Sequence, residues 1–404
     1  MRVLYLCHRI PYPPDKGEKI RAFYQLQAIA ARHEVDLFTL ADGSELAHAG
    51  VLRGFCRSVV VDRLKPSMAR LRALPYLLTQ KPLTVPYFEY PVLRREIRAA
   101  VASRSYDRIF VYCSAMAQYV DPEWRIPVLA DFVDVDSDKW RQYAVFARWP
   151  FSAIYRREAR TLREYERQIG ERSACVLVTT AREAVLIRQI SDRVSVHVVP
   201  NGVDIERFQP PSQAAVPGPP TIGFTGDMSY FPNVEAVTFF ARNVLPIVRR
   251  SVPAARFLVV GRNPSPKVLA LSAIRGVEVT GFVPDVRGQL ARMHVAVAPF
   301  SVAAGIQNKI LEAMAFAIPV VCTPRAAQGL SDGAAGAVET VEGADAMAGR
   351  IVALLENPEL ARFKGLEGRS RVALDYRWDR SLGRLLDLLE HPTSPKPPLE
   401  AYAK

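Results

Sequence analysis

The hydrophobic pattern of the first half of the chain alternates between short apolar runs and amphipathic segments. Seven apolar runs predict buried strands: RVLYLC, EVDLFTL, SVVVD, DRIFVY, IPVLADF, CVLVTT and VSVHVVP. The segment from Gly17 to Arg32 predicts an amphipathic helix between the first two strands. Apolar strands that alternate with helices indicate a parallel sheet covered by helices on both faces.

This pattern breaks after Asp204, where IERFQPPSQAAVPGPP predicts a Pro-rich linker at 205–220. Alternation resumes with the apolar runs TIGFTG, RFLVVG, VEVTGF and VAVAPF. Helices are predicted from about Asn233 to Val248 and around Val286 to Arg292. Two such series predict an α/β protein with two Rossmann-like domains. A ligand is expected between them, at the carboxyl ends of the strands.

The predicted domain boundaries follow from this break. We place the first domain at residues 1–204 and the second at residues 221–375. A helix at 376–390 is expected to return to the first domain, and the tail HPTSPKPPLEAYAK at 391–404 is expected to be disordered.

The composition is that of an ordinary globular protein, with 49% of the 404 residues hydrophobic and 23% charged. Five scattered cysteines without a C-x-x-C pair predict reduced thiols in a cytoplasmic protein. No signal peptide is visible, and no run approaches the roughly 20 apolar residues of a membrane-spanning helix. Six dispersed histidines show no metal-ligand spacing, so no metal site is predicted.

The net charge of +12 lies mainly in the first half of the chain. Residues 1–200 carry 31 basic and 22 acidic side chains, whereas residues 201–404 carry 22 and 19. This excess indicates an anionic partner, such as nucleic acid, lipid headgroups or a phosphorylated acceptor. No known nucleic-acid-reading motif accompanies it, so nucleic acid is not expected.

Two basic segments, Leu64–Pro82 and Trp140–Gln168, mix Arg and Lys with aromatic and aliphatic residues. Such segments can lie as amphipathic helices on an anionic membrane surface. The alternative is that these helices pack on their domain and expose a solvated basic face. The protein is therefore expected in the cytoplasm, either free or at the cytoplasmic face of the inner membrane.

The stretch VAAGIQNKILEAMAFAIPVVCT, from Val302 to Thr323, carries the most chemistry. It predicts a loop, a helix and a buried strand, with Lys309 and Glu312 on one helical face. A loop that enters a helix N-terminus binds anions through free backbone N–H groups, and here the loop residues are Gly305, Ile306, Gln307 and Asn308. An added lysine can meet phosphate and a carboxylate can accept from sugar hydroxyls, which suits a nucleotide sugar.

Other strand ends carry glycine or basic residues. Gly226 and Gly261 end two strands of the second series, and Arg262 follows the second glycine. Neither is part of a G-x-G-x-x-G motif, and this absence disfavours binding of a dinucleotide cofactor. In the first series, HRIPYPPDKGEKIR predicts either a phosphate loop or a solvated basic turn. Its candidate residues are Lys16, Gly17, Lys19 and Arg21.

The segment DFVDVDSDKW clusters four aspartates after a predicted strand, at positions 131, 134, 136 and 138. No glycine or distal glutamate completes a calcium loop. The cluster either caps the next helix or takes part in acceptor binding and catalysis, for which Asp134 is the candidate.

Six segments together resemble the family 4 retaining glycosyltransferases, which have the GT-B fold. They are the loop with Gly17, PNGVD at 200–204, TGDMSYFPN at 225–233, VVGR at 259–262, GFVPDV at 281–286 and AGIQNKILEAMAFAIPVV at 304–321. The segments PPDKGEKIR, DFVDVDSDKW and GIQNKILEAMA further resemble the sugar transferases of exosortase and exopolysaccharide systems.

The resemblance implies particular roles and particular departures. Glu312 matches the second carboxylate of the family's paired-glutamate motif, which holds the donor ribose, while the first carboxylate falls at Ala304. Where many relatives have an Arg and a Lys, this chain has Asp227-Met228-Ser229. Near Cys113, where relatives often have a histidine, none is present, and Asp134 is expected to take part of that role.

The function implied is transfer of a hexosyl-type sugar from a UDP- or GDP-linked donor to a glycan or polyprenyl-linked acceptor. Configuration is retained, and no cofactor or metal is needed. Lys309 and Arg262 are expected to meet the charge of the leaving diphosphate. Three alternatives stay open: a nucleotide-sugar epimerase, a nicotinamide-dependent oxidoreductase and a non-catalytic nucleotide-sugar-binding scaffold.

Overall fold

The first sheet is built from residues before Pro200. The computed structural model describes residues 1–43, 45–210, 218–303 and 305–392. Within these ranges the first sheet has seven parallel strands in the order β3-β2-β1-β4-β5-β6-β7. They are β1 Arg2–Cys7, β2 Glu34–Ala41, β3 Ser58–Arg63, β4 Arg108–Tyr112, β5 Val128–Val133, β6 Cys175–Val178 and β7 Val196–Val198.

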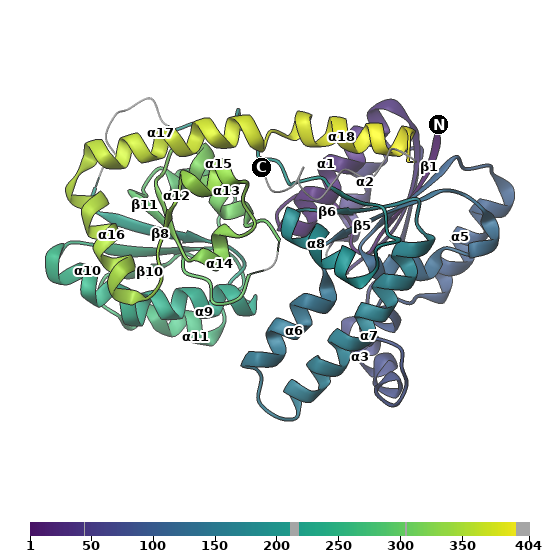
Figure 1. The fold of residues 1–404 in the computed structure, drawn as a ribbon, viewed down its shortest axis with the longest axis horizontal. Helices are drawn as coiled ribbons and strands as arrows, with labels where there is room; N and C mark the ends of the chain where they lie inside the picture. The colour runs from purple at the N-terminus through teal and green to yellow at the C-terminus, as the bar shows by residue number, and fades with distance from the viewer. Residues whose placement is uncertain (44, 211–217, 304, 393–404) are drawn as a thin grey trace. The chain divides into compact units, whose positions relative to one another are not determined.

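Helices cover both faces of this sheet (Figure 1). The helices of this unit are α1 Gly17–Arg32, α2 Ala49–Leu52, α3 Pro66–Ala73, α4 Thr84–Tyr87, α5 Pro91–Ser103, α6 Asp136–Phe146, α7 Phe151–Arg172 and α8 Ala181–Ile190, with short 3₁₀ turns η1 Leu46–His48, η2 Leu74–Leu78, η3 Ser114–Tyr119 and η4 Pro122–Trp124. The predicted helix from Gly17 to Arg32 is confirmed. Two apolar clusters fill the two faces, one centred on Leu4 and Val111 and the other on Tyr5 and Phe110.

The second sheet follows the same plan. Within the described ranges it has six parallel strands in the order β10-β9-β8-β11-β12-β13. They are β8 Thr221–Thr225, β9 Arg256–Val260, β10 Val277–Val279, β11 Val295–Ala298, β12 Val320–Cys322 and β13 Glu339–Thr340. In both sheets the strand order reverses beside the first strand of the series, and ligands of such folds bind at the carboxyl ends of the strands around that point.

Helices and short helical turns connect the strands of the second sheet and follow its last strand. They are α9 Phe231–Phe239, the π-helical turn η5 Phe240–Val244, α10 Leu245–Ser251, α11 Pro266–Leu269, the 3₁₀ turn η6 Ala270–Ala273, α12 Arg287–Leu290, α13 Asn308–Ala315, α14 Pro324–Ala327, α15 Asp332–Gly336, α16 Ala344–Glu356 and α17 Pro358–Asp375. The helix predicted around Val286 to Arg292 is only the single turn α12.

The helix predicted from Asn233 to Val248 needs correction. It begins at Phe231, because Pro232 lacks an N–H and fits the first helical turn. It is also interrupted by the π-helical turn before α10, whose first turn contains Pro246. A proline inside a continuous α-helix would remove a hydrogen bond and clash with the preceding turn, and the wider turn accommodates it.

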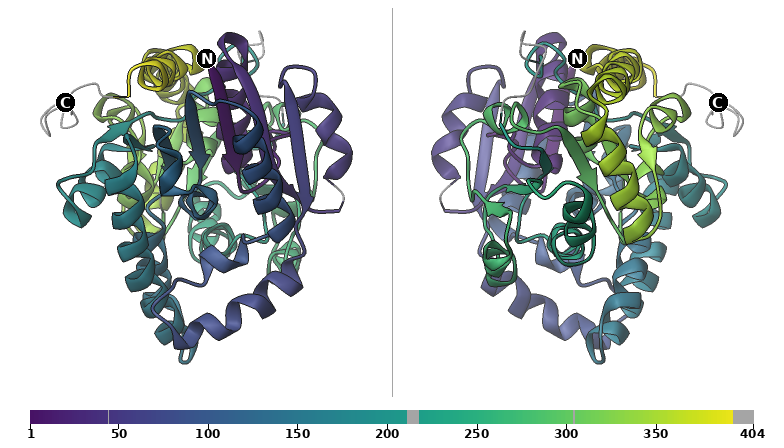
Figure 2. Two further views of the ribbon diagram at one scale, coloured as in Figure 1. Left: turned by 90° about the vertical axis from the view of Figure 1, so that its right-hand side faces the viewer. Right: turned by 90° about the vertical axis from the view of Figure 1, so that its left-hand side faces the viewer.

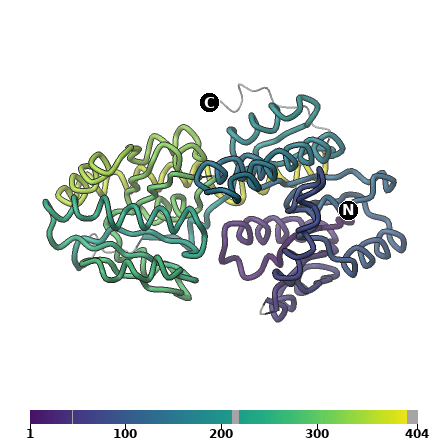
Figure 3. Tube along the Cα trace, turned by 90° about the horizontal axis from the view of Figure 1, so that it is seen from below, coloured from purple at the N-terminus to yellow at the C-terminus, as the bar shows by residue number. Residues whose placement is uncertain are grey.

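The chain divides into two units, Met1–Pro200 with Arg380–Lys404, and Asn201–Asp379. The path through each unit can be followed in Figure 3. The last helix, α18 Trp378–Glu390, contributes Leu385 and Leu389 to the core beside α1, and Arg108 Nε donates to the Leu389 carbonyl at 2.9 Å. Residues 211–217 of the predicted linker and residues 393–404 of the predicted tail lie outside the described residues.

Candidate functional site

Two glycines end adjacent strands of the second sheet with their backbones in contact. Gly226 follows β8 and Gly261 follows β9, with φ of +155° and +153°. A Cβ on Gly261 would lie 1.6 Å from the Gly226 carbonyl oxygen, so no side chain fits there. A Cβ on Gly226 would lie 3.0 Å from Lys309 Nζ. The backbone at Gly226, which carries no side chain, therefore lies beside the Lys309 ammonium group.

Lys309, in the first turn of α13, is held by groups from distant parts of the sequence. Its Nζ donates to Asn233 Oδ1 at 2.6 Å and lies 4.2 Å from the ring centre of Phe224 and 4.7 Å from that of Phe300. Burial lowers the pKa of Lys309 to about 7, although the nearby Glu312 carboxylate opposes this shift. A ligand anion beside the ammonium would favour its charged form.

Glu312 lies one helical turn beyond Lys309 and is also half-buried. Burial raises its pKa to about 7, while the positive charges of Lys309 and Arg207 oppose the shift. Its carboxylate makes no side-chain hydrogen bond to another of the described residues. The oxygens are therefore available to accept from ligand hydroxyl groups.

Arg262 is the second cation of this edge. Its Nε lies 3.2 Å from Asp227 Oδ2, and that aspartate also accepts from the Ser229 hydroxyl at 2.6 Å. The Met228 N–H donates to the Arg262 carbonyl at 2.9 Å, which joins the β8 and β9 loops. The structure thus brings Gly226, Arg262 and Lys309 to one edge of the sheet, with Arg262 anchored by an aspartate.

The loop before α13 is braced from two sides. Gly305 has φ +59°, and its carbonyl oxygen would lie 2.3 Å from a Cβ on Gly329. Asn201 Nδ2 donates to Asn308 Oδ1 at 2.9 Å. The N-cap residue Gln307 makes no capping hydrogen bond with its side chain, which leaves N–H groups of the first turn open to an anion. Ile306 is buried, and Ala304 lies outside the described residues.

The predicted phosphate loop of the first unit is wrong for two of its residues. Lys19 is buried and paired with Glu45. Arg21 is fully buried, with Nε 2.9 Å from Asp131 Oδ2 and Nη1 2.8 Å from the Val199 carbonyl oxygen. Both side chains are buried, so they neutralise internal carboxylates and not a ligand. Lys16 and Gly17 stay near the surface at the start of the helix.

The four aspartates of the first unit have different surroundings. Three are paired with cations: Asp131 with Arg21, Asp136 with Lys139 and Asp138 with Arg182.

Asp134 instead lies against Glu183, the buried capping residue of α8, which accepts from the Thr179 and Thr180 hydroxyls. Burial raises the pKa of Asp134, and it raises that of Glu183 to about 8, helped by the charge of Asp134. The structure thus identifies a carboxyl pair that favours sharing a proton.

Sequence reasoning missed five residues of these sites: Asn201, Phe224, Asn233, Phe300 and Glu183. Their only sequence signals were the Asn-Gly turn for Asn201 and the Thr-x-x-Glu capping box for Glu183. Among the described residues, no cluster of three His, Cys, Asp or Glu side chains could hold a metal ion. Within the same ranges, no helix combines the length and the apolar character that crossing a membrane requires.

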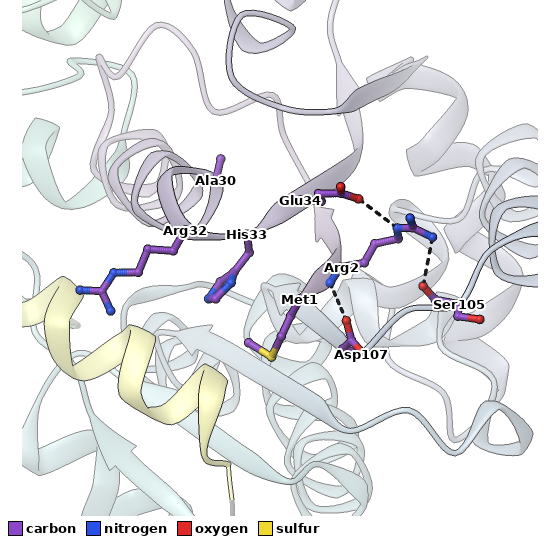
Figure 4. Close-up of a pocket in the computed structure, with 8 residues that line it drawn as sticks. All are labelled: Met1, Arg2, Ala30, Arg32, His33, Glu34, Ser105 and Asp107. Carbon is purple, nitrogen blue, oxygen red and sulfur yellow. Dashed lines mark hydrogen bonds and ion pairs between the residues drawn. The ribbon is translucent and has the colours of Figure 1, made fainter.

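A cavity of about 640 Å³ lies at the amino ends of β1, β2 and β4 (Figure 4). Three of its charged residues pair with one another: Arg2 Nε lies 3.2 Å from Glu34 Oε2, and the Arg2 backbone N–H donates to Asp107 Oδ2 at 2.6 Å. This is the opposite edge of the sheet from the strand ends described above, and nothing there is built for a nucleotide.

The match to a known protein family lies within the second unit. Residues 219–357 match the family model described as "Glycosyl transferases group 1". This match contains Gly226, Arg262, Lys309 and Glu312. A D-inositol 3-phosphate glycosyltransferase of Nocardia farcinica is 28% identical over 290 residues, which are 62% of this chain and 61% of that protein. The match therefore spans less than two thirds of the relative's length.

Solved structures show the fold. Sucrose-phosphate synthase from Thermosynechococcus elongatus matches with a TM-score of 0.70 and 19% identity, over 96% of this chain and 98% of that one. Anabaena HepE in complex with UDP matches with a TM-score of 0.68 and 16% identity, over 96% of this chain and all of the other. The predicted α/β fold with two Rossmann-like domains of the GT-B class is confirmed.

Proposed function

We propose that this protein is a glycosyltransferase that uses a nucleotide-sugar donor. The observation that carries the proposal is the Lys309 ammonium, fixed by Asn233 between two aromatic rings beside the bare backbone of Gly226. A cation, open helix N–H groups and side-chain-free loops are the features that a diphosphate needs. The family model covers this edge of the sheet, which supports sugar transfer over other uses of a diphosphate.

The donor is proposed to be UDP- or GDP-linked. HepE, whose fold matches, is described in complex with UDP and with UDP-glucose. In our proposal the diphosphate lies against Gly226, Lys309 and the loop Gly305–Asn308. The Glu312 carboxylate accepts hydrogen bonds from the ribose hydroxyls. The absence of a G-x-G-x-x-G motif argues against a nicotinamide cofactor at this place.

The proposed reaction breaks the bond between the anomeric carbon and the diphosphate oxygen and forms a bond from that carbon to the acceptor oxygen. Both events occur on one face of the sugar, so configuration is retained. The acceptor hydroxyl gives its proton to the departing diphosphate, and no strong general base is required. Lys309 and Arg262 stabilise the negative charge that develops on the diphosphate.

The acceptor is proposed to bind the first unit near Asp134. A protonated carboxyl donates one hydrogen bond and accepts others, so the Asp134–Glu183 pair suits a hydroxyl-rich glycan. A glycan or polyprenyl-linked acceptor, in exopolysaccharide or cell-surface glycan synthesis at the cytoplasmic face of the inner membrane, fits the resemblance to exosortase-system transferases.

A second candidate is a nucleotide-sugar-binding scaffold without activity. It is favoured by Ala304, which occupies the position where resembling enzymes have their first carboxylate. A nucleotide-sugar epimerase, the other alternative, would convert the donor sugar without any acceptor.

A thermal-shift screen against UDP-, GDP- and ADP-sugars tests the proposal. A donor at about 100 times its Kd should stabilise the folded protein by about 2.7 kcal/mol and raise Tm. Release of free nucleotide in the presence of an acceptor extract then separates the enzyme from the scaffold, and product analysis without acceptor separates it from the epimerase. If no nucleotide sugar raises Tm, the proposal is wrong.

A further inference from the structure

The first unit exposes large apolar side chains on two neighbouring segments. The first segment is α3 with η2, where Met68, Leu71, Leu74 and Leu78 are exposed, Leu78 to 95%. The second is the turn between α6 and α7, where Val145, Phe146, Trp149 and Phe151 are exposed, Trp149 to 83%. Groups this apolar are rarely left together in water unless they meet a partner. We call the two segments together the apolar edge.

Hydrogen bonds hold the two segments together. Arg157 of α7 donates to the Lys81 carbonyl at 2.9 Å and also to those of Tyr76 and Thr79. Glu158, the next residue, accepts from the Leu83 N–H at 2.7 Å and the Thr84 N–H at 2.8 Å. Figure 2 shows α3 and the α6–α7 hairpin at the same end of the first unit. The apolar edge is therefore one surface built by two parts of the sequence.

The two helices of the hairpin are joined by side-chain contacts. Trp140 on α6 packs against Tyr155 on α7, with ring centres 4.9 Å apart. Ser137 and Glu166 are joined by a buried hydrogen bond from the Ser137 N–H at 3.0 Å. The turn with Trp149 is thus presented by an ordered support, which extends away from the sheet (Figure 1).

The charge of the apolar edge has one sign. Residues 65–83 contain four basic and no acidic residues, and residues 139–157 contain five basic and no acidic residues. Exposed members include Arg70, Lys81, Arg148 and Arg156. Basic side chains around exposed Leu, Phe and Trp match an anionic bilayer, where cations meet headgroups and aromatic rings lie at the interface.

We propose that the apolar edge docks on an anionic lipid bilayer without spanning it. Nucleic acid would pair with the arginines but would leave Leu78 and Trp149 in water. A lipid surface accommodates both the basic and the apolar side chains. The inference deepens the proposed function by giving a lipid-linked acceptor a route to the enzyme. Docking needs no sugar donor, so vesicle binding and sugar transfer can each fail separately.

The test is co-sedimentation of the full chain with vesicles, without any nucleotide sugar. Phosphatidylcholine vesicles are compared with vesicles of phosphatidylcholine mixed with phosphatidylglycerol. Binding should be at least about 10-fold tighter to the anionic vesicles, since each basic residue near such a surface contributes about 5-fold. Added salt should weaken it.

A double variant tests the apolar contribution. Trp149→Ser with Phe151→Ser should weaken binding to anionic vesicles by at least about 10-fold, because two large apolar side chains no longer leave water. Phe363→Ser with Leu366→Ser is the matched control, since both residues are exposed on α17 of the second unit. Both double variants should keep the wild-type Tm, because the changed side chains are in solvent.

Several results would overturn the proposal. These are no binding to anionic vesicles, equal binding to both vesicle types, or an equal loss in the control variant. A dimer in sedimentation velocity that the Trp149/Phe151 variant abolishes would show that a second copy of the chain covers the edge. Binding to DNA that competes with vesicles and survives the double variant would assign the basic residues to nucleic acid.

Discussion

The strand ends of the two units carry opposite chemistry on the same topology. In the first unit, β5 and the start of α8 place Asp134 against Glu183, and burial holds these carboxyls toward their neutral forms. In the second unit, β8, β9 and α13 gather Gly226, Gly261 and Lys309. The topology supplies the position of a site in each unit, and the side chains decide what it can bind.

The proposed division of the transfer reaction, with the donor at the second unit and the acceptor at the first, rests on this difference. A diphosphate is attracted to a lysine and open helix N–H groups, whereas a carboxyl pair repels it. A hydroxyl-rich acceptor has no such preference and can hydrogen-bond to protonated carboxyls. In the first unit, Lys19, Arg21 and Lys139 are paired with carboxylates, and further basic residues lie along the apolar edge.

The largest effect is expected from Lys309→Ala. Removing the ammonium should lower turnover by about 100- to 1,000-fold, the loss typical of removing one group that stabilises developing charge. Steady-state kinetics and a melting curve measure this together. Lys267→Ala, on the exposed start of α11, is the control and should keep wild-type turnover. Unchanged turnover in Lys309→Ala would remove the lysine from the mechanism.

Gly261→Ala should disrupt the same strand ends by a clash with the backbone. The new Cβ would lie 1.6 Å from the Gly226 carbonyl oxygen, so the β8 and β9 loops must separate. We expect a loss of about 3 kcal/mol in the free energy of unfolding, measured by urea denaturation. Gly288→Ala in α12, where a Cβ meets nothing within 4 Å, is the matched control. Equal stability of the two variants would contradict the close contact.

Glu312→Gln should separate donor binding from chemistry. A neutral amide accepts more weakly from ribose hydroxyls than a carboxylate, so the donor Kd should rise about 10-fold with little change in kcat. Calorimetry gives Kd and kinetics give kcat. A fall in kcat at unchanged Kd would move Glu312 from donor binding to the reaction itself.

The last test concerns the pH dependence of the first unit. Burial raises the pKa of Glu183 from 4.5 to about 8. Between these two pH values the unfolded chain has lost a proton that the folded chain keeps. The free energy of unfolding should therefore fall as pH rises from 5 to 8, with this group contributing up to about 1.4 kcal/mol per pH unit.

Glu183→Gln cannot ionise, so its stability should fall less over the same range. Urea denaturation at both ends of the window, with exposed Glu342→Gln as the control, measures the difference. An equal or steeper fall in Glu183→Gln would show that the carboxyl is already ionised in the folded protein.

The fold could be predicted because strand and helix patterns are local. The helix Gly17–Arg32 and the alternation of both series follow from residues within a few positions of one another. The interruption of the helix before Pro246 was missed because the hydrophobic pattern continues through it.

The sites were only partly predictable because their contacts are distant in sequence. Lys309 was chosen from a loop that enters a helix and the glycines from strand ends, but Asn233 reaches Lys309 across 76 positions. Arg21 was mistaken for a ligand residue because its partner, Asp131, lies 110 positions away. Charged residues are usually exposed, so sequence alone does not indicate that one will be buried against a partner.

One titration tests the assignment of the donor to the second unit. The nucleotide sugar that raises Tm most is titrated calorimetrically into the wild-type protein, Lys309→Ala and Asp134→Asn. Lys309→Ala should weaken binding by at least about 10-fold, as expected for loss of a charged hydrogen bond, and Asp134→Asn should leave Kd essentially unchanged. Binding that survives in Lys309→Ala but is lost in Asp134→Asn would contradict the assignment and place the donor in the first unit.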